Sequence, residues 1–249
     1  MPLNIYDYSP YIDEQGEISL LNRIQGMIRY GSDWYSEMQA QQKIITRLQK
    51  FLSDRYTLIR NFTLPDEEVP IPLMLIGPQG ILVMYATNVA GIFEAREKEW
   101  LEMDNRSNKF VPTQPNLVLR TVLFARAVKN FLDKKGFAVP EPEPVIIFTH
   151  PGADVSTASP AARIVLSDAL NRFVTAIQAT PAVLDPTEKR TIIELFRKVQ
   201  TVTTTEPKSG ASLLDKLNFS TTQWIVLGGM LSLFAIIILI LLALLLANS

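Results

Sequence analysis

The residues of this chain that could do chemistry are few. The 249-residue sequence contains no cysteine and a single histidine, His150. Without cysteine there is no thiolate nucleophile, no disulfide and no cysteine-bound zinc, and one histidine excludes motifs that need two, such as H-E-x-x-H. His150 stands in a His-Pro-Gly sequence after an apolar run, with no evident orienting partner or nucleophile. We therefore interpret it as a turn residue and not as a catalytic base.

Two short groups of carboxylates are the remaining candidates for metal-dependent chemistry. Carboxylate oxygens are the ligands that Mg²⁺ prefers, so either group could contribute to a magnesium site. Acidic clusters of this kind are more often solvated loop faces, and we favour that interpretation. The residues concerned are Asp66, Glu67 and Glu68 in the first group, and Glu94, Glu97 and Glu99 in the second.

The charge of the chain gives no general attraction to nucleic acid. The sequence has 24 basic and 25 acidic residues, a formal net charge of −1, whereas nucleic-acid-binding domains usually carry a basic excess. A group of basic residues lies along and just after one predicted helix, and a solvated helix face explains it better than phosphate binding. These residues are Arg120, Arg126, Lys129, Lys134 and Lys135.

Hydrophobic periodicity predicts the elements that must position these residues. Helical spacing of apolar residues indicates five helices, and apolar or alternating runs indicate six strands. The order, with a β-meander after the second helix, predicts an α/β fold with a central mixed β-sheet flanked by helices. The predicted helices are 18–30, 33–54, 116–133, 161–179 and 186–199; the predicted strands are 56–62, 69–76, 81–88, 91–95, 99–103 and 144–149.

The carboxyl-terminal segment from Trp224 to Ala247 has the composition of a single transmembrane helix. Its 24 residues include no charge and no proline, and sixteen are Leu, Ile, Val or Phe. A helix of that length is about 36 Å long, against a bilayer core of about 30 Å. We expect a tail-anchored, single-pass membrane protein whose partner is the lipid bilayer, with Trp224 as an interfacial anchor.

The flanks and one face of this segment carry further information. Lys208 and Lys216 precede it and no charged residue follows it, so the positive-inside rule predicts a cytoplasmic amino-terminal domain. Gly228, Ser232 and Ala235 fall at i, i+4 and i+7, a spacing that favours self-association but is also ordinary transmembrane composition.

The chain thus divides into four parts. Residues 1–32 are predicted to form an amino-terminal helical extension, to which the sequence assigns no role, and residues 33–200 are predicted to form the main domain. Residues 201–222 are rich in Thr and Ser and are predicted to be a linker, and residues 223–247 form the membrane helix. The first eleven residues lack the basic and apolar regions of a secretory signal.

The predicted hairpin carries a resemblance to a known family. The run from Ile71 to Asn88, with Gly77-Pro78-Gln79-Gly80 at its turn and Gly91 after it, resembles the core of the nuclease-related domain (NERD) family. That family resembles a branch of the PD-(D/E)xK, restriction-endonuclease-like fold. The similarity extends to the segments around Asn61-Phe62, Trp100 and Phe148-Thr149-His150-Pro151, and covers residues 33–199.

The resemblance implies a nuclease site whose key residues are replaced. The family pattern has an acidic residue in the first hairpin strand, and an acidic residue and a lysine two apart in the second; the matching positions here are Pro72, Tyr85 and Thr87. None of these can hold Mg²⁺ or supply the lysine charge that such hydrolysis uses. The upstream helix glutamate of the family corresponds to Gln41 or Gln42.

Two functions follow from this pattern. The favoured one is a catalytically inactive nuclease-related domain without cofactor, acting as a binding or scaffolding module at the membrane for an unidentified protein partner. The alternative is an active Mg²⁺-dependent nuclease with relocated carboxylates, which alone would make nucleic acid a partner. A purely structural, oligomerising membrane protein is a third class. Four apolar residues at the replaced site, either core or a protein-binding surface, are Leu73, Leu75, Met84 and Tyr85.

Overall fold

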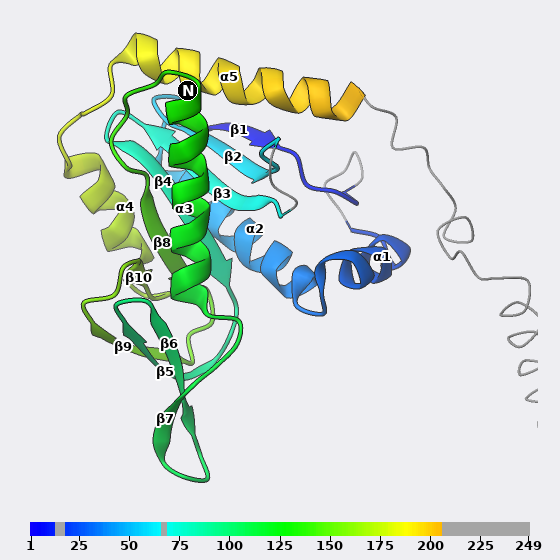
Figure 1. Ribbon diagram of the computed structural model, residues 1–249, viewed down its shortest axis with the longest axis vertical. Helices are drawn as coiled ribbons and strands as arrows, with labels where there is room; N and C mark the ends of the chain where they lie inside the picture. The colour runs from blue at the N-terminus through cyan, green and yellow to red at the C-terminus, as the bar shows by residue number, and fades with distance from the viewer. Residues whose placement is uncertain (13–17, 66–68, 206–249) are drawn as a thin grey trace, which may run out of the picture. The chain divides into compact units, whose positions relative to one another are not determined.

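The computed structural model describes residues 1–12, 18–65 and 69–205, and within them Met1–Thr203 forms one compact unit (Figure 1). In these ranges no helix is both long and apolar enough to cross a bilayer. The predicted membrane segment from Trp224 to Ala247 lies outside the described residues, as does most of the predicted linker.

The main sheet has six strands in the order β1-β2-β3-β4-β8-β10. The β2, β3 and β4 strands are antiparallel neighbours, whereas β1 pairs with β2, and β8 with β4 and β10, in parallel. The sheet is therefore mixed, as the sequence predicts. Its strands are β1 (Asn4–Asp7), β2 (Thr57–Phe62), β3 (Ile71–Gly77), β4 (Gly80–Thr87), β8 (Glu143–Phe148) and β10 (Arg163–Val165).

Helices cover both faces of this sheet, so that it forms the middle layer of an α/β fold (Figure 1). On one face α2 (Trp34–Phe51) and α4 (Leu170–Ala179) bury a cluster with Leu48 and Phe173 at its centre. On the other face α3 (Leu117–Lys134) and α5 (Pro186–Thr205) bury a second cluster. The β3 and β8 strands are buried along nearly their whole length because both faces are covered.

A second, four-stranded sheet in the order β7-β6-β5-β9 adjoins the main one. Phe93 and Trp100 from this sheet stack at 4.9 Å, and Trp100 stacks on Phe148 of the main sheet at 5.8 Å, which joins the two. The start of α3 packs on the same cluster. The strands are β5 (Gly91–Arg96), β6 (Glu99–Asp104), β7 (Lys109–Pro112) and β9 (Ala153–Ala158).

The Gly77–Gly80 turn is a two-residue hairpin connection, as predicted. Gly77 pairs with Gly80, and Gly80 has φ 115°, a conformation that side chains disfavour. The Pro78 carbonyl accepts hydrogen bonds from the backbone N–H groups of Val183 and Leu184, at 2.8 and 3.0 Å. The hairpin is therefore tied to the segment between α4 and α5.

Several segments differ from the sequence prediction, which also lacks the strands β7 and β9. The helix predicted from residue 161 begins only at Leu170, because Ile164 and Val165 pair with β8 as a short parallel strand. Residues 4–7 add the edge strand β1 to the main sheet, before the expected helix α1 (Leu20–Tyr30). The last helix, α5, continues through Thr205 into the predicted linker.

Candidate functional site

The three positions that the resemblance assigns to the nuclease pattern lie at one end of the β3–β4 hairpin. Leu73 pairs with Met84 in register, so Pro72 and Tyr85 form the next pair along. Tyr85 and Thr87 lie beside Ile146 and Phe148 of β8, because β4 and β8 are parallel. All three side chains are buried; Tyr85 is 2% and Thr87 3% exposed.

A pocket of about 170 Å³ opens beside Tyr85 and Thr87, and Pro72 does not line it. Aromatic side chains of the small sheet, Phe93 and Trp100, form one wall. The rest of the lining is rich in oxygen donors and acceptors, which come from the start of α2, the end of β4, β6 and the segment before α3. These polar residues are Asp33, Ser36, Glu37, Asn88, Glu102, Thr113 and Gln114.

Glu37, Tyr85 and Arg120 form the polar centre of this site. The Tyr85 hydroxyl donates a hydrogen bond to Glu37 Oε1. Arg120 Nη1 lies 3.5 Å from the same carboxylate oxygen and donates to the Tyr85 hydroxyl at 3.3 Å. The Arg120 guanidinium also lies over the Tyr85 ring, 5.0 Å from its centroid. The same carboxylate oxygen, Glu37 Oε1, thus accepts the phenol hydrogen bond and contacts the guanidinium.

Burial decides the protonation behaviour of both acids. Desolvation raises the pKa of Glu37 above its usual 4.5, although the Tyr85 hydrogen bond and the Arg120 charge oppose that shift. Desolvation, with the negative charge of Glu37 beside it, raises the pKa of Tyr85 far above its ordinary range. Tyr85 therefore stays protonated at any physiological pH and acts as a hydrogen-bond donor.

These residues do not fit a magnesium ion. A magnesium site takes carboxylates with free oxygens, whereas Glu37 Oε1 already contacts both the Tyr85 hydroxyl and the Arg120 guanidinium. Tyr85 is a neutral phenol, and the Thr87 hydroxyl accepts the backbone N–H of Val89 at 3.3 Å. Within residues 1–12, 18–65 and 69–205, no three His, Cys, Asp or Glu side chains gather to hold one metal ion.

The carboxylates singled out in the sequence lie elsewhere. Glu94 is paired with Arg96 at 2.8 Å on β5, and neither Glu97 nor Glu99 lines the pocket. Asp66, Glu67 and Glu68 are outside the described residues. His150 stands in the turn after β8, where its Nδ1 accepts the Gly152 N–H at 3.0 Å. That contact agrees with its interpretation as a turn residue.

Gln41 and Gln42, one of which the resemblance matches to the family's helix glutamate, both contact a buried arginine, Arg60. Arg60 Nε donates to Gln41 Oε1 at 2.8 Å, and Nη1 donates to Gln42 Oε1 at 3.0 Å and to Asp7 Oδ2 at 3.1 Å. Its Nη2 donates to the Met38 carbonyl at 2.9 Å. Desolvation lowers the pKa of Arg60, and the charge of Asp7 opposes the shift.

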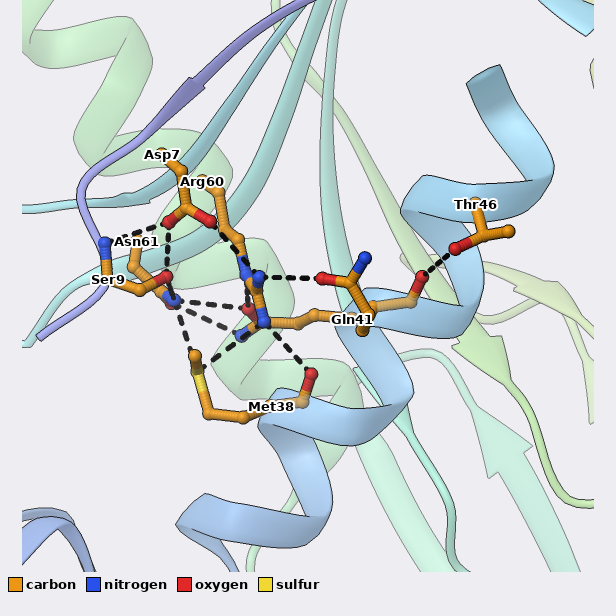
Figure 2. A network of polar contacts seen from close by, with 8 residues as sticks. Asp7, Ser9, Met38, Gln41, Thr46, Arg60 and Asn61 are labelled. Carbon is orange, nitrogen blue, oxygen red and sulfur yellow. Dashed lines mark hydrogen bonds and ion pairs between the residues drawn. The ribbon is translucent and has the colours of Figure 1, made fainter. Parts of the chain in front are cut away.

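Asn61 extends this network to the amino-terminal strand. Asn61 adopts a positive φ of 50°, a conformation that Asn tolerates better than most residues. Its amide donates to Ser9 Oγ at 2.7 Å and to Gln41 Oε1 at 3.1 Å (Figure 2). The network therefore joins β1, β2 and α2, and gives residues 1–12 a structural role.

Glu37 and Arg120 belong to the site, although the family pattern does not point to either of them. Glu37 is the only acidic residue in α2 and stands four residues before Gln41, on the same helix face. That isolated acid was an available signal. Arg120 was grouped with solvated basic residues, but it points to Tyr85 and Glu37. Leu73, Leu75 and Met84 are core residues beneath α2 and α4, which favours core over a binding surface for that apolar group.

A comparison with protein families matches part of this domain. Residues 36–149 match the model of the nuclease-related domain, NERD. No match was found among curated proteins, and none among solved structures. The matched segment contains the hairpin together with Glu37, Tyr85 and Arg120. The chain therefore carries a nuclease-related domain over residues 36–149, within a mixed α/β fold whose sheets are flanked by helices.

Proposed function

We propose that this chain is a tail-anchored, single-pass membrane protein whose nuclease-related domain is catalytically inactive and acts as a binding or scaffolding module. The domain has a restriction-endonuclease-like fold and lies in the cytoplasm. It needs no metal or other cofactor, and its binding partner is a protein. The composition of Trp224 to Ala247 supports the anchor, and Lys208 and Lys216 before it support the orientation.

One observation carries the proposal of inactivity: the Glu37 carboxylate is bonded to both Tyr85 and Arg120. In a metal-dependent nuclease, a carboxylate here would point its oxygen at the ion. In this chain the Glu37 carboxylate contacts the guanidinium of Arg120 instead of a metal ion. Tyr85, which stands where the family pattern has its second acidic residue, donates a hydrogen bond to the same carboxylate. The pair stabilises the domain instead of assembling a reaction centre.

A nuclease assay tests this proposal. Fragment 1–205 is suitable because the three buried clusters draw only on residues between Leu3 and Val199. We expect no cleavage of single- or double-stranded DNA or RNA with Mg²⁺ or Mn²⁺. Metal-dependent cleavage that is abolished by Glu37→Gln or Glu102→Gln would overturn the proposal.

That outcome would establish the second candidate, an active metal-dependent nuclease with relocated carboxylates. The observation in its favour is that Asp33, Glu37 and Glu102 line one pocket. A variant that restores the family's acidic and lysine residues provides a second test between the two functions. If the inactive domain keeps the family geometry, Pro72→Asp with Tyr85→Glu and Thr87→Lys creates Mn²⁺ binding that calorimetry detects, whereas the unaltered fragment binds none.

The anchor has its own test. Full-length protein should remain in the membrane fraction after alkaline carbonate extraction, whereas fragment 1–205 should not resist that treatment. Pairing through Gly228, Ser232 and Ala235 is tested by crosslinking full-length protein against a Gly228→Leu, Ser232→Leu variant. Loss of crosslinks would support helix pairing, and unchanged crosslinks would place self-association elsewhere.

A further inference from the structure

The helix α1 exposes four large apolar side chains on one face. Leu20 and Ile28 are 74% exposed, Leu21 57% and Ile24 41%. At 100° per residue, these four positions fall within an arc of about 100° on the helix surface. Single exposed apolar residues are normal on soluble domains, but a continuous stripe of this kind marks an interaction surface.

The packing of α1 on its own domain uses a different face. Gly26 is the buried residue of α1, and the Trp34 ring lies where its side chain would be: an added Cβ would come within 2.2 Å of that ring. Arg23 lies over the Tyr35 ring at 4.0 Å. These contacts fix the rotation of α1 against the start of α2 and turn the apolar stripe outward, at the periphery of the described domain (Figure 1).

The charges on α1 itself are of one sign. The helix contains no acidic residue, and its two cations, Arg23 and Arg29, fall on opposite sides of the stripe. An apolar stripe flanked by arginines fits the boundary between anionic headgroups and acyl chains, where apolar side chains enter the lipid and guanidinium groups meet phosphate.

We propose that α1 is a membrane-docking helix, which lies on an anionic bilayer surface with Leu20, Leu21, Ile24 and Ile28 inserted. The helix has 11 residues, about 16 Å in length, so the attachment is weak and reversible. It holds the domain against the bilayer in one orientation. This inference concerns a surface within residues 1–205 and does not depend on the segment from Trp224 to Ala247.

Vesicle binding by fragment 1–205 tests the surface without the predicted anchor. We expect the fragment to bind phosphatidylcholine vesicles that contain phosphatidylglycerol, and to bind phosphatidylcholine alone more weakly. An Ile24→Ser, Ile28→Ser variant should lose about a hundred-fold in affinity, because each apolar side chain contributes about ten-fold or more when buried. The matched control is Leu119→Ser, Leu123→Ser on α3, two exposed leucines with the same i, i+4 spacing, which should bind as the unaltered fragment does.

A label at the stripe measures insertion directly. The chain has no cysteine, so Ile28→Cys and Leu119→Cys each carry one environment-sensitive dye. We expect a blue shift, and quenching by spin-labelled acyl chains, at position 28 only, and a larger signal with anionic vesicles than with phosphatidylcholine alone. The proposal is overturned if the fragment does not bind these vesicles, if both serine variants lose binding equally, or if the position 28 dye is already shielded without lipid. If the dye is shielded without lipid, the stripe is covered by a second copy of the chain or by another part of the same chain.

Discussion

The hydroxyl of Tyr85 donates its hydrogen bond to the carboxylate of Glu37, across the gap between β4 and the first turn of α2. Both residues lie within the segment that matches the nuclease-related domain. The hydrogen bond ties a helix to the sheet through a phenol that does not ionise. Its contribution to stability can be measured separately from any question of activity.

Tyr85→Phe should destabilise the domain. The variant keeps the ring and leaves the largely buried Glu37 carboxylate without its phenol donor, a change that costs about 1–3 kcal/mol. Urea unfolding of fragment 1–205 gives the free energy of unfolding. The control is Tyr56→Phe: the buried Tyr56 hydroxyl has no hydrogen-bond partner among the described residues, so its removal should cost nothing. Equal effects of the two substitutions would contradict the prediction.

Glu37 should make stability depend on pH with a defined sign. Its folded pKa is raised above 4.5, so the stability it contributes is present below pH 4.5 and is lost as pH rises through the folded pKa. The unfolding free energy of the unaltered fragment, relative to Glu37→Gln, should therefore fall over that window. Glu94 gives the opposite control, because Arg96 lowers its pKa. A difference between the fragment and Glu37→Gln that rises with pH would contradict this assignment.

Arg60 should be among the residues least tolerant of change outside the apolar core. Its side chain is 4% exposed. Arg60→Met would remove the donor to Gln42 Oε1 and to Asp7 Oδ2, and one of the two donors to Gln41 Oε1, at a cost of about 1–3 kcal/mol. Arg96→Met removes a surface pair whose arginine is 49% exposed, which should leave stability almost unchanged because exposed ion pairs contribute little. Thermal and urea unfolding of both variants check the contrast; similar losses would mean that the Arg60 network adds little.

Gly77 should not accept a side chain. A Cβ at this position would lie 2.5 Å from the Tyr56 ring, so Gly77→Ala should cost about 1–3 kcal/mol through overpacking. The cause is tested by a double-mutant cycle with Tyr56→Leu, a background in which the alanine penalty should shrink. An alanine penalty that is unchanged in that background would place the strain in the backbone of the turn instead.

The sequence was most informative where local pattern and burial agree. The β3–β4 hairpin, α2 and α3 were found within a few residues, because their apolar periodicity reflects burial under neighbouring layers. The β9 strand was missed because its Ala, Ser, Thr and Asp residues show no alternation. The three-residue β10 strand was hidden in a helical pattern, since only its pairing with β8 makes it a strand.

The candidate site shows the same limit. The hairpin motif located Tyr85 and Thr87, but Glu37 and Arg120 come from two helices separated by most of the matched segment. Their convergence on one hydroxyl depends on how α2 and α3 pack against the sheet, which residue spacing does not specify. For the same reason Gln41 and Gln42 could not be assigned to Arg60 before the structure was known.

The way α4 and α5 complete the two large clusters has a practical consequence for protein production. The segment that matches the family ends at residue 149, yet Phe173 and Phe196, one on each side of the main sheet, come after it. A protein trimmed to the matched boundaries would expose the apolar side chains on both faces of the main sheet to water and should precipitate on expression. The smallest soluble version must instead retain the strand at Asn4–Asp7 and continue to the end of α5.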